Sequence, residues 1–148
     1  MRYSSPYVGA PGSWIRGNFH SHCRENSPCG NIPLAQAVAQ YAAVPMQVLA
    51  LTDHNHITNA DELQKIHPRT MLLSGFEHSR GRDMLFLGAT DSRLCSLPLP
   101  EAISLASAGG KDRPALAVCH PDPSKNGDYW TAEMIRALPA MPDCLEVF

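Results

Sequence analysis

Histidines and carboxylates follow four short apolar segments of this 148-residue chain. The residues of interest are His20, His22, Asp53, His54, Glu77 and His120. In an extended backbone, residues i and i+2 point to the same face, so the imidazoles of His20 and His22 can reach one metal ion. We therefore expect a metal centre to which separate segments each contribute a ligand.

This mixture of imidazole and carboxylate suits Zn, Mn or Fe, and a carboxylate can bridge two ions in a two-metal hydrolase. Glu77 is the bridging candidate, and Asp53, which is adjacent to His54, is expected to hold a ligand imidazole in its metal-binding tautomer. Asp53, His54 and Glu77 are accordingly the predicted catalytic residues. The predicted metal ligands are His20, His22, His54, Glu77 and His120. Such ions generate hydroxide near neutral pH, so no nucleophilic side chain is required.

Alternating strands and helices are expected to position these groups. Short apolar runs predict strands at 14–19, 46–52, 70–76, 84–89, 115–119 and 144–148, and helices are predicted at 33–44, 61–66, 100–108 and 131–138. Thr131 is a candidate N-cap. Repeated βα units predict an α/β fold with a parallel sheet, either open or closed into a (β/α) barrel, whose functional groups gather where the strands end.

Several other polar residues have simpler explanations. His67 precedes Pro68 and predicts a turn, and Cys119 is expected in the core. His56 and His78 are left out of the ligand set as polar loop residues. Basic side chains near the Glu77 and His120 segments could meet a phosphate, although surface loops carry such charges routinely. They are Arg80, Arg82 and Lys125.

Composition narrows the classes of protein and partner. The formal net charge is −2, which provides no basic excess for gripping a long nucleic acid. We found no signal-like segment and no apolar run near the ~20 residues of a membrane span, so we expect a soluble cytoplasmic protein. The five cysteines include no CxxC pair and predict reduced, mostly buried thiols.

Four segments together resemble, in order and spacing, the first motifs of the polymerase and histidinol phosphatase (PHP) superfamily of metal-dependent phosphoesterases. They are WIRGNFHSH at 14–22, LTDHN at 51–55, GFE at 75–77 and HP at 120–121. The resemblance covers 14–148, with 1–13 as an N-terminal extension. It implies a distorted (β/α)7 barrel holding two or three Zn, Mn or Fe ions. It further implies that His20 and His22 bind the first metal, that Glu77 bridges, that His120 binds the second metal and that His54 binds the third.

The chain also departs from the family pattern. Where relatives usually have an acidic or histidine-bearing turn, residues 27–30 read SPCG, so either the third metal is weakened or Cys29 replaces the ligand with a softer one. Leu85 stands where many relatives have a histidine. The late Asp-x-His motif is missing, and the strand predicted at 144–148 ends the chain. The missing motif and the terminal strand favour a truncated domain with an incomplete centre, or alternatively a partner subunit, such as a second copy, that covers the last strand. Cys29, Leu85 and the missing motif favour a non-catalytic module.

Three functions follow from this pattern. The leading prediction is a phosphoesterase acting on a small phosphate ester such as a nucleotide, short oligonucleotide or sugar phosphate. Because the WIRGN lead-in also resembles relatives that hydrolyse carboxylic or carbamate esters, that reaction is a close alternative. The third is a degenerate, non-catalytic metal-binding or structural module.

Overall fold

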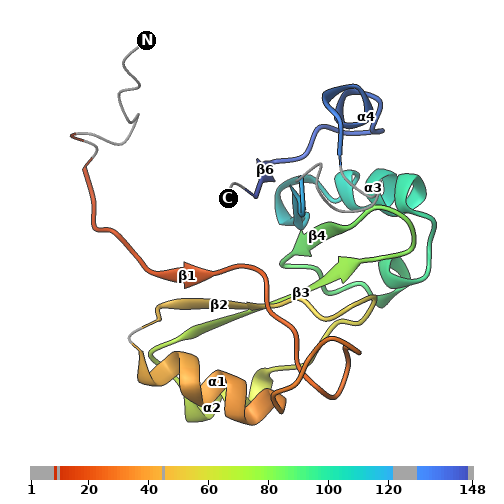
Figure 1. Ribbon diagram of the computed structural model, residues 1–148. Helices are drawn as coiled ribbons and strands as arrows, with labels where there is room; N and C mark the ends of the chain where they lie inside the picture. The colour runs from red at the N-terminus through yellow and green to blue at the C-terminus, as the bar shows by residue number, and fades with distance from the viewer. Residues whose placement is uncertain (1–8, 10, 45, 122–129, 147–148) are drawn as a thin grey trace.

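Six strands form one curled sheet in the computed structural model, which describes residues 9, 11–44, 46–121 and 130–146 (Figure 1). The sheet follows the chain order, and its strands are β1 (Gly17–Asn18), β2 (Val48–Leu51), β3 (Met71–His78), β4 (Met84–Leu87), β5 (Ala115–Val118) and β6 (Cys144–Leu145). The curled sheet makes a half-barrel. The predicted α/β class is therefore confirmed, together with a barrel-like sheet.

One strand runs against the predicted direction. β1, β2 and β3 are parallel, and β5 and β6 are parallel, but β4 is antiparallel to both β3 and β5. The expectation of an entirely parallel sheet is wrong at β4. Only residues 79–83 join β3 to β4, and a parallel crossover needs a dozen residues or more. Gly81, with φ +125°, supplies the turn of the resulting hairpin.

The helices lie close to their predicted positions. They are α1 (Leu34–Ala43), α2 (Asp61–Ile66), α3 (Leu99–Ser107) and α4 (Ala132–Arg136). Thr131 caps α4 as predicted, because its hydroxyl oxygen accepts a hydrogen bond from the Met134 N–H at 3.2 Å. Two short 3-10 helices, Ser92–Cys95 and Gly110–Asp112, were not predicted.

The core is divided between two halves of the molecule. The amino-terminal half comprises β1, β2, α1 and α2, and its buried apolar cluster is Val38, Leu49, Leu51 and Ala60. The carboxyl-terminal half comprises β3 to β6 with α3 and α4, and it holds a larger cluster that includes Phe76, Phe86 and Ile103. In Figure 1, α1 and α2 lie together beneath β2 and β3, whereas α3 lies near β4.

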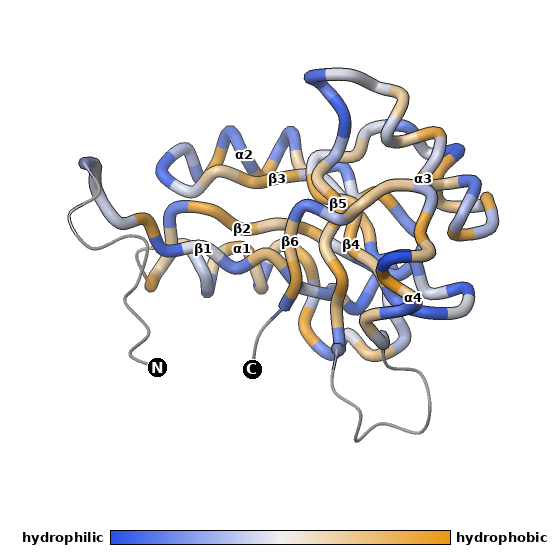
Figure 2. Tube along the Cα trace, turned by 90° about the horizontal axis from the view of Figure 1, so that it is seen from above, coloured by the Kyte–Doolittle hydropathy of each residue, from blue (hydrophilic) through white to orange (hydrophobic). Residues whose placement is uncertain are grey.

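Alternation along β3 gives the sheet two different faces in the carboxyl-terminal half. Phe76 and His78 point to the α3 side, whereas Glu77 points to the inner face, where Leu85 is its partner across the β3–β4 ladder. Figure 2 shows hydrophobic residues running along β2 and β4 and hydrophilic residues on the outward turns of α2. None of the helices in the described part of the chain has the length and apolar character to cross a membrane.

Candidate metal centre

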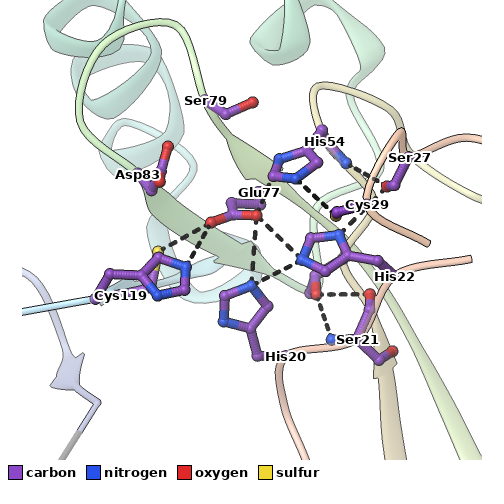
Figure 3. Close-up of polar contacts among 12 residues, drawn as sticks. His20, Ser21, His22, Ser27, Cys29, His54, Glu77, Ser79, Asp83 and Cys119 are labelled. Carbon is purple, nitrogen blue, oxygen red and sulfur yellow. Dashed lines mark hydrogen bonds and ion pairs between the residues drawn. The ribbon is translucent and has the colours of Figure 1, made fainter. Parts of the chain in front are cut away.

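Four imidazoles surround one fully buried carboxylate at the ends of the strands (Figure 3). Glu77 Oε2 lies 3.0 Å from His54 Nδ1, 3.2 Å from His22 Nε2 and 3.4 Å from His20 Nε2. Glu77 Oε1 lies 3.2 Å from His120 Nε2. The structure therefore brings all five predicted ligands together, although their assignment to individual ions stays a prediction.

Hydrogen bonds to β2 and to the residue after it orient the His-x-His segment, which follows β1. The Ser21 N–H donates to Thr52 Oγ1 at 2.9 Å, and the Ser21 hydroxyl donates to the Ala50 carbonyl at 2.5 Å. Because Ser21 faces β2, the flanking imidazoles of His20 and His22 both point away from it, and their Nε2 atoms lie 3.0 Å apart. The expectation that residues i and i+2 share a face is confirmed.

Backbone pairing places His54 beside Glu77. The Glu77 N–H donates to the Asp53 carbonyl at 3.1 Å, and the Asn55 N–H donates to the Glu77 carbonyl at 2.8 Å. Asn55 and His120 both have positive φ, at 50° and 52°. Asparagine tolerates this conformation well, whereas at His120 it is uncommon and costs energy. Strained backbone of this kind is concentrated at functional sites, which fits the position of His120.

Asp53 reaches the imidazole of His22 through Ser27. Its buried carboxylate accepts hydrogen bonds from the Cys23 N–H at 2.7 Å, the Ser27 hydroxyl at 2.8 Å and the Thr58 hydroxyl at 2.5 Å. Ser27 Oγ in turn lies 3.3 Å from His22 Nδ1. Asp53 therefore organises the loop that supports His22. Adjacent residues in extended backbone point to opposite faces, so the Asp53 carboxylate points away from the His54 ring.

Glu146 belongs to the centre, although sequence reasoning missed it. Its Oε1 lies 2.6 Å from His20 Nδ1, and its Oε2 accepts a hydrogen bond from the His120 N–H at 3.1 Å. The contact joins the end of β1 to the end of β6. Its position directly after the apolar pair Cys144 and Leu145 is the same strand-end placement that identified the other ligands, so the sequence did carry a signal for it.

The charges of this cluster shift two pKa values in opposite directions. Burial acts to raise the pKa of Glu77, but the adjacent His20 and His22 outweigh burial and hold the pKa well below its usual range. Burial acts to lower the pKa of His20, but Glu77 and Glu146 outweigh it and the pKa is raised. A negative Glu77 is therefore stabilised by positive charge contributed by its neighbours.

The polar groups present fit a divalent ion. His54 Nδ1 and Glu77 Oε2 are buried, and neither forms a hydrogen bond of suitable geometry with any residue that the structure describes. Glu77 Oε1 is paired with His120 and Cys119, but a buried carboxylate oxygen without such a partner is costly unless a cation compensates it. Two sets of side chains bring their ligand atoms within 4.8 Å of one another: His20, Glu77, Cys119 and His120, and His22, Cys29 and His54. The cluster could therefore hold metal, as the predicted cofactor requires.

No disulfide joins the five cysteines, all of which lie in the described residues, and three of the five are buried. Cys119 is buried in the inner-face cluster with Leu85 and Ala117, as expected for a core residue, but its Sγ also lies 3.5 Å from Glu77 Oε1. Burial and the nearby Glu77 and Glu146 raise the pKa of Cys119. Cys29 and Cys144 are exposed.

The histidines left out of the ligand set lie elsewhere. His56 is exposed, and His67 follows the last residue of α2. His78 is buried rather than in a polar loop, with its Nε2 2.9 Å from the Leu97 carbonyl. Of the basic residues, Arg82 lies 6.0 Å from the centroid of the Trp130 ring. Lys125 is outside the described residues.

A cavity of about 570 Å3 opens beside the centre, between the His-x-His segment, the 29–32 loop and α1. His20, His22 and Cys29 form part of its wall, and Asn31, Gln40 and Tyr41 add polar groups. This volume is in the range of small-molecule sites. Among the described residues that line the cavity, none is lysine or arginine.

No family model matches the sequence, and no curated protein matches it either.

Proposed function

We propose that this chain carries a metal-dependent hydrolase centre of the PHP type, on a half-barrel that is part of a distorted (β/α)7 barrel. The proposed substrate is a small phosphate ester, hydrolysed with two or three divalent ions, Zn, Mn or Fe. The proposed ligands are His20, His22, His54, Glu77 and His120.

One observation carries this proposal: the two oxygens of Glu77 face different imidazoles. Oε2 faces His20, His22 and His54, whereas Oε1 faces His120. A carboxylate in this position can bridge two ions. When bound, such ions lower the pKa of a coordinated water and neutralise charge on a phosphoryl group.

The chain's own residues have separate tasks in this proposal. Glu77 holds the imidazoles around one point, and Asp53 acts as a positioning residue because it reaches His22 through Ser27. The adjoining cavity admits a small ester and is too small for a long polymer.

A second candidate is hydrolysis of a carboxylic or carbamate ester on the same centre. The cavity wall supports this alternative, because its described residues offer no lysine or arginine to a phosphate. An uncharged ester would not need such a residue. For a phosphate ester, the bound ions would have to supply the positive charge.

Metal content tests the ligand assignment. We expect elemental analysis of purified protein to find two or three ions, and Glu77→Ala or His22→Ala to abolish tight binding. His56→Ala is the matched control, because His56 is an exposed histidine two residues from His54. Full metal content in both the Glu77 and His22 variants would refute the assignment.

Activity assays then identify the reaction. Protein loaded with Zn, Mn or Fe is offered an aryl phosphate monoester, an aryl phosphate diester and an aryl carboxylic ester in parallel. Turnover of a phosphate substrate that disappears in Glu77→Ala and persists in His56→Ala supports the leading proposal. Turnover of the carboxylic ester alone supports the second candidate. Metal binding without turnover of any substrate overturns both, and indicates a structural metal module.

A further inference from the structure

The two possible ligand sets differ in chemistry. One combines the carboxylate of Glu77 with the imidazoles of His20 and His120 and the buried thiol of Cys119. The other contains only imidazoles and a thiol, from His22, Cys29 and His54, and all three residues belong to the amino-terminal half. Cys29 Sγ lies 3.2 Å from His54 Nε2, so the thiol is already within reach of one of these imidazoles (Figure 3).

The loop that carries Cys29 is folded tightly against its own backbone. The Ser27 N–H donates to the Cys23 carbonyl, and the Gly30 N–H donates to the Ser27 carbonyl, both at 3.0 Å. A Cβ at Gly30 would overlap the Cys23 carbonyl group, so only glycine permits this approach. Asp53 fixes the other side of the loop through Cys23 and Ser27. The position of Cys29 is therefore determined by its loop.

The opposite ring nitrogen of His54 faces the rest of the centre. His54 Nδ1 lies 3.0 Å from Glu77 Oε2 and is buried without a hydrogen bond of suitable geometry, whereas Nε2 faces Cys29. The rings of His22 and His54 are stacked, with centroids 4.4 Å apart. These contacts bring both imidazoles beside the thiol, and Cys29 and His22 also line the cavity.

We propose that His22, Cys29 and His54 form a thiolate-containing subsite that selects a zinc-class ion over manganese or magnesium. The inference rests on the metal centre proposed above but not on its reaction. Thiolate and imidazole ligands favour zinc, whereas Mn and Mg favour oxygen ligands such as Glu77. On binding, a sulfur–metal coordination bond replaces the S–H bond of Cys29, and the proton leaves to solvent without any redox change.

Cobalt(II) is the probe, because it occupies zinc sites and gives a near-ultraviolet charge-transfer band when thiolate is bound. Metal-free full-length protein is titrated with cobalt while absorbance and bound cobalt are both measured. We expect the band in the unaltered protein and in Cys144→Ser, the control for an exposed thiol. We expect Cys29→Ser to lose the band and to weaken zinc binding at this subsite by at least about tenfold.

Replacing the ligand type tests the selectivity directly. Cys29→Asp exchanges a soft ligand for a hard one, so we expect zinc-over-manganese preference in a competition titration to fall by about tenfold or more. Circular dichroism confirms that the variants remain folded, as expected for an exposed position.

The outcomes separate this inference from the proposed function. Cobalt that binds without a thiolate band, or a band that keeps its full intensity in Cys29→Ser, overturns the subsite and leaves the metal centre intact. An unchanged zinc-over-manganese preference in Cys29→Asp also overturns it. Failure of the protein to bind cobalt, zinc or manganese at all overturns both proposals.

Discussion

The two halves of the molecule hold their ligands by different means. In the carboxyl-terminal half, twelve buried residues form the apolar cluster on the α3 side of the sheet, and strand register places Glu77 on the opposite face. In the amino-terminal half, the buried cluster has only four residues. There, the loop around His22 is held instead by hydrogen bonds that converge on the buried carboxylate of Asp53.

This difference indicates that stability and metal affinity can be separated by mutation. Apolar packing in the carboxyl-terminal half should support the whole fold, because the strands that it holds contribute both to the sheet and to the centre. The Asp53 network should act mainly on the subsite of His22, Cys29 and His54. Glu77 and His20 connect the halves, since one side chain comes from each.

Phe86→Ala is expected to produce the largest loss of stability. Phe86 is fully buried and its ring stacks on Phe76, with centroids 4.7 Å apart. Removal of such a side chain costs about 3–5 kcal/mol in the free energy of unfolding, from lost burial and the cavity that remains. Urea denaturation measures the change. Met71→Ala is the exposed control in β3 and should cost less than about 0.5 kcal/mol.

Leu49→Ala tests the smaller apolar cluster. A loss of stability equal to that of Phe86→Ala would contradict the proposed difference between the two halves. Leu49 is also fully buried, so its truncation is not neutral, and the expected cost is about 2–5 kcal/mol. We expect it to lie toward the lower end of that range, because fewer buried neighbours surround it.

Asp53→Asn is expected to have a smaller effect on stability and a selective effect on metal. The amide turns one acceptor oxygen into a donor, which faces either the Cys23 N–H and the Ser27 hydroxyl or the Thr58 hydroxyl, so we expect a loss of about 1–3 kcal/mol. Because the loop carrying Cys29 loses its support, the affinity for cobalt should fall more at the thiolate subsite than at the site of Glu77 and His120. A cobalt titration followed by absorbance distinguishes the two sites, because the thiolate band reports on cobalt bound at the thiolate subsite.

Asp91→Asn is the control for Asp53→Asn. Asp91 pairs with Arg93 at the surface, so this variant should change stability by less than about 1 kcal/mol and leave metal binding intact. Equal weakening of both subsites in Asp53→Asn would show that the network does not act locally.

Sequence patterns predicted the parts of this fold that depend on periodicity and on strand ends. The helices, the buried β2 and the five clustered ligands all follow from apolar runs and the polar residues directly after them. The direction of β4 follows from the length of the connection before it and not from the apolar pattern of the strand. Residues 79–83 are too few for a parallel crossover. A glycine within so short a connection, here Gly81, is typical of a hairpin turn.

Two features of the site depend on contacts that no local pattern specifies. The sequence predicts that Asp53 orients a ligand imidazole, and Asp53 reaches that of His22 through Ser27. It does not point toward its neighbour His54, because neighbours in extended backbone point to opposite faces. Its actual partners, Cys23 and Ser27, lie in a distant loop whose path no local pattern specifies. Glu146 was missed because the strand predicted over 144–148 places it inside a strand, whereas β6 ends at Leu145 and the curled sheet brings Glu146 to His20.

The ion pair that joins the two halves gives the smallest effect, visible as a pH dependence of the metal-free protein. The pKa of His20 is raised, so its contribution to stability is complete below the ordinary value of 6.5 and is lost as the pH rises through the raised pKa. The pKa of Glu77 is lowered, so its contribution is complete above the ordinary value of 4.5 and is lost as the pH falls through the lowered pKa. Both contributions are therefore complete between pH 4.5 and 6.5. Urea denaturation in chelator should show that His20→Asn destabilises the protein more at a pH inside this window than at a pH above the raised pKa of His20. The same loss at both values would show that the two halves meet without this charge interaction, because other titrating groups are common to the unaltered protein and the variant.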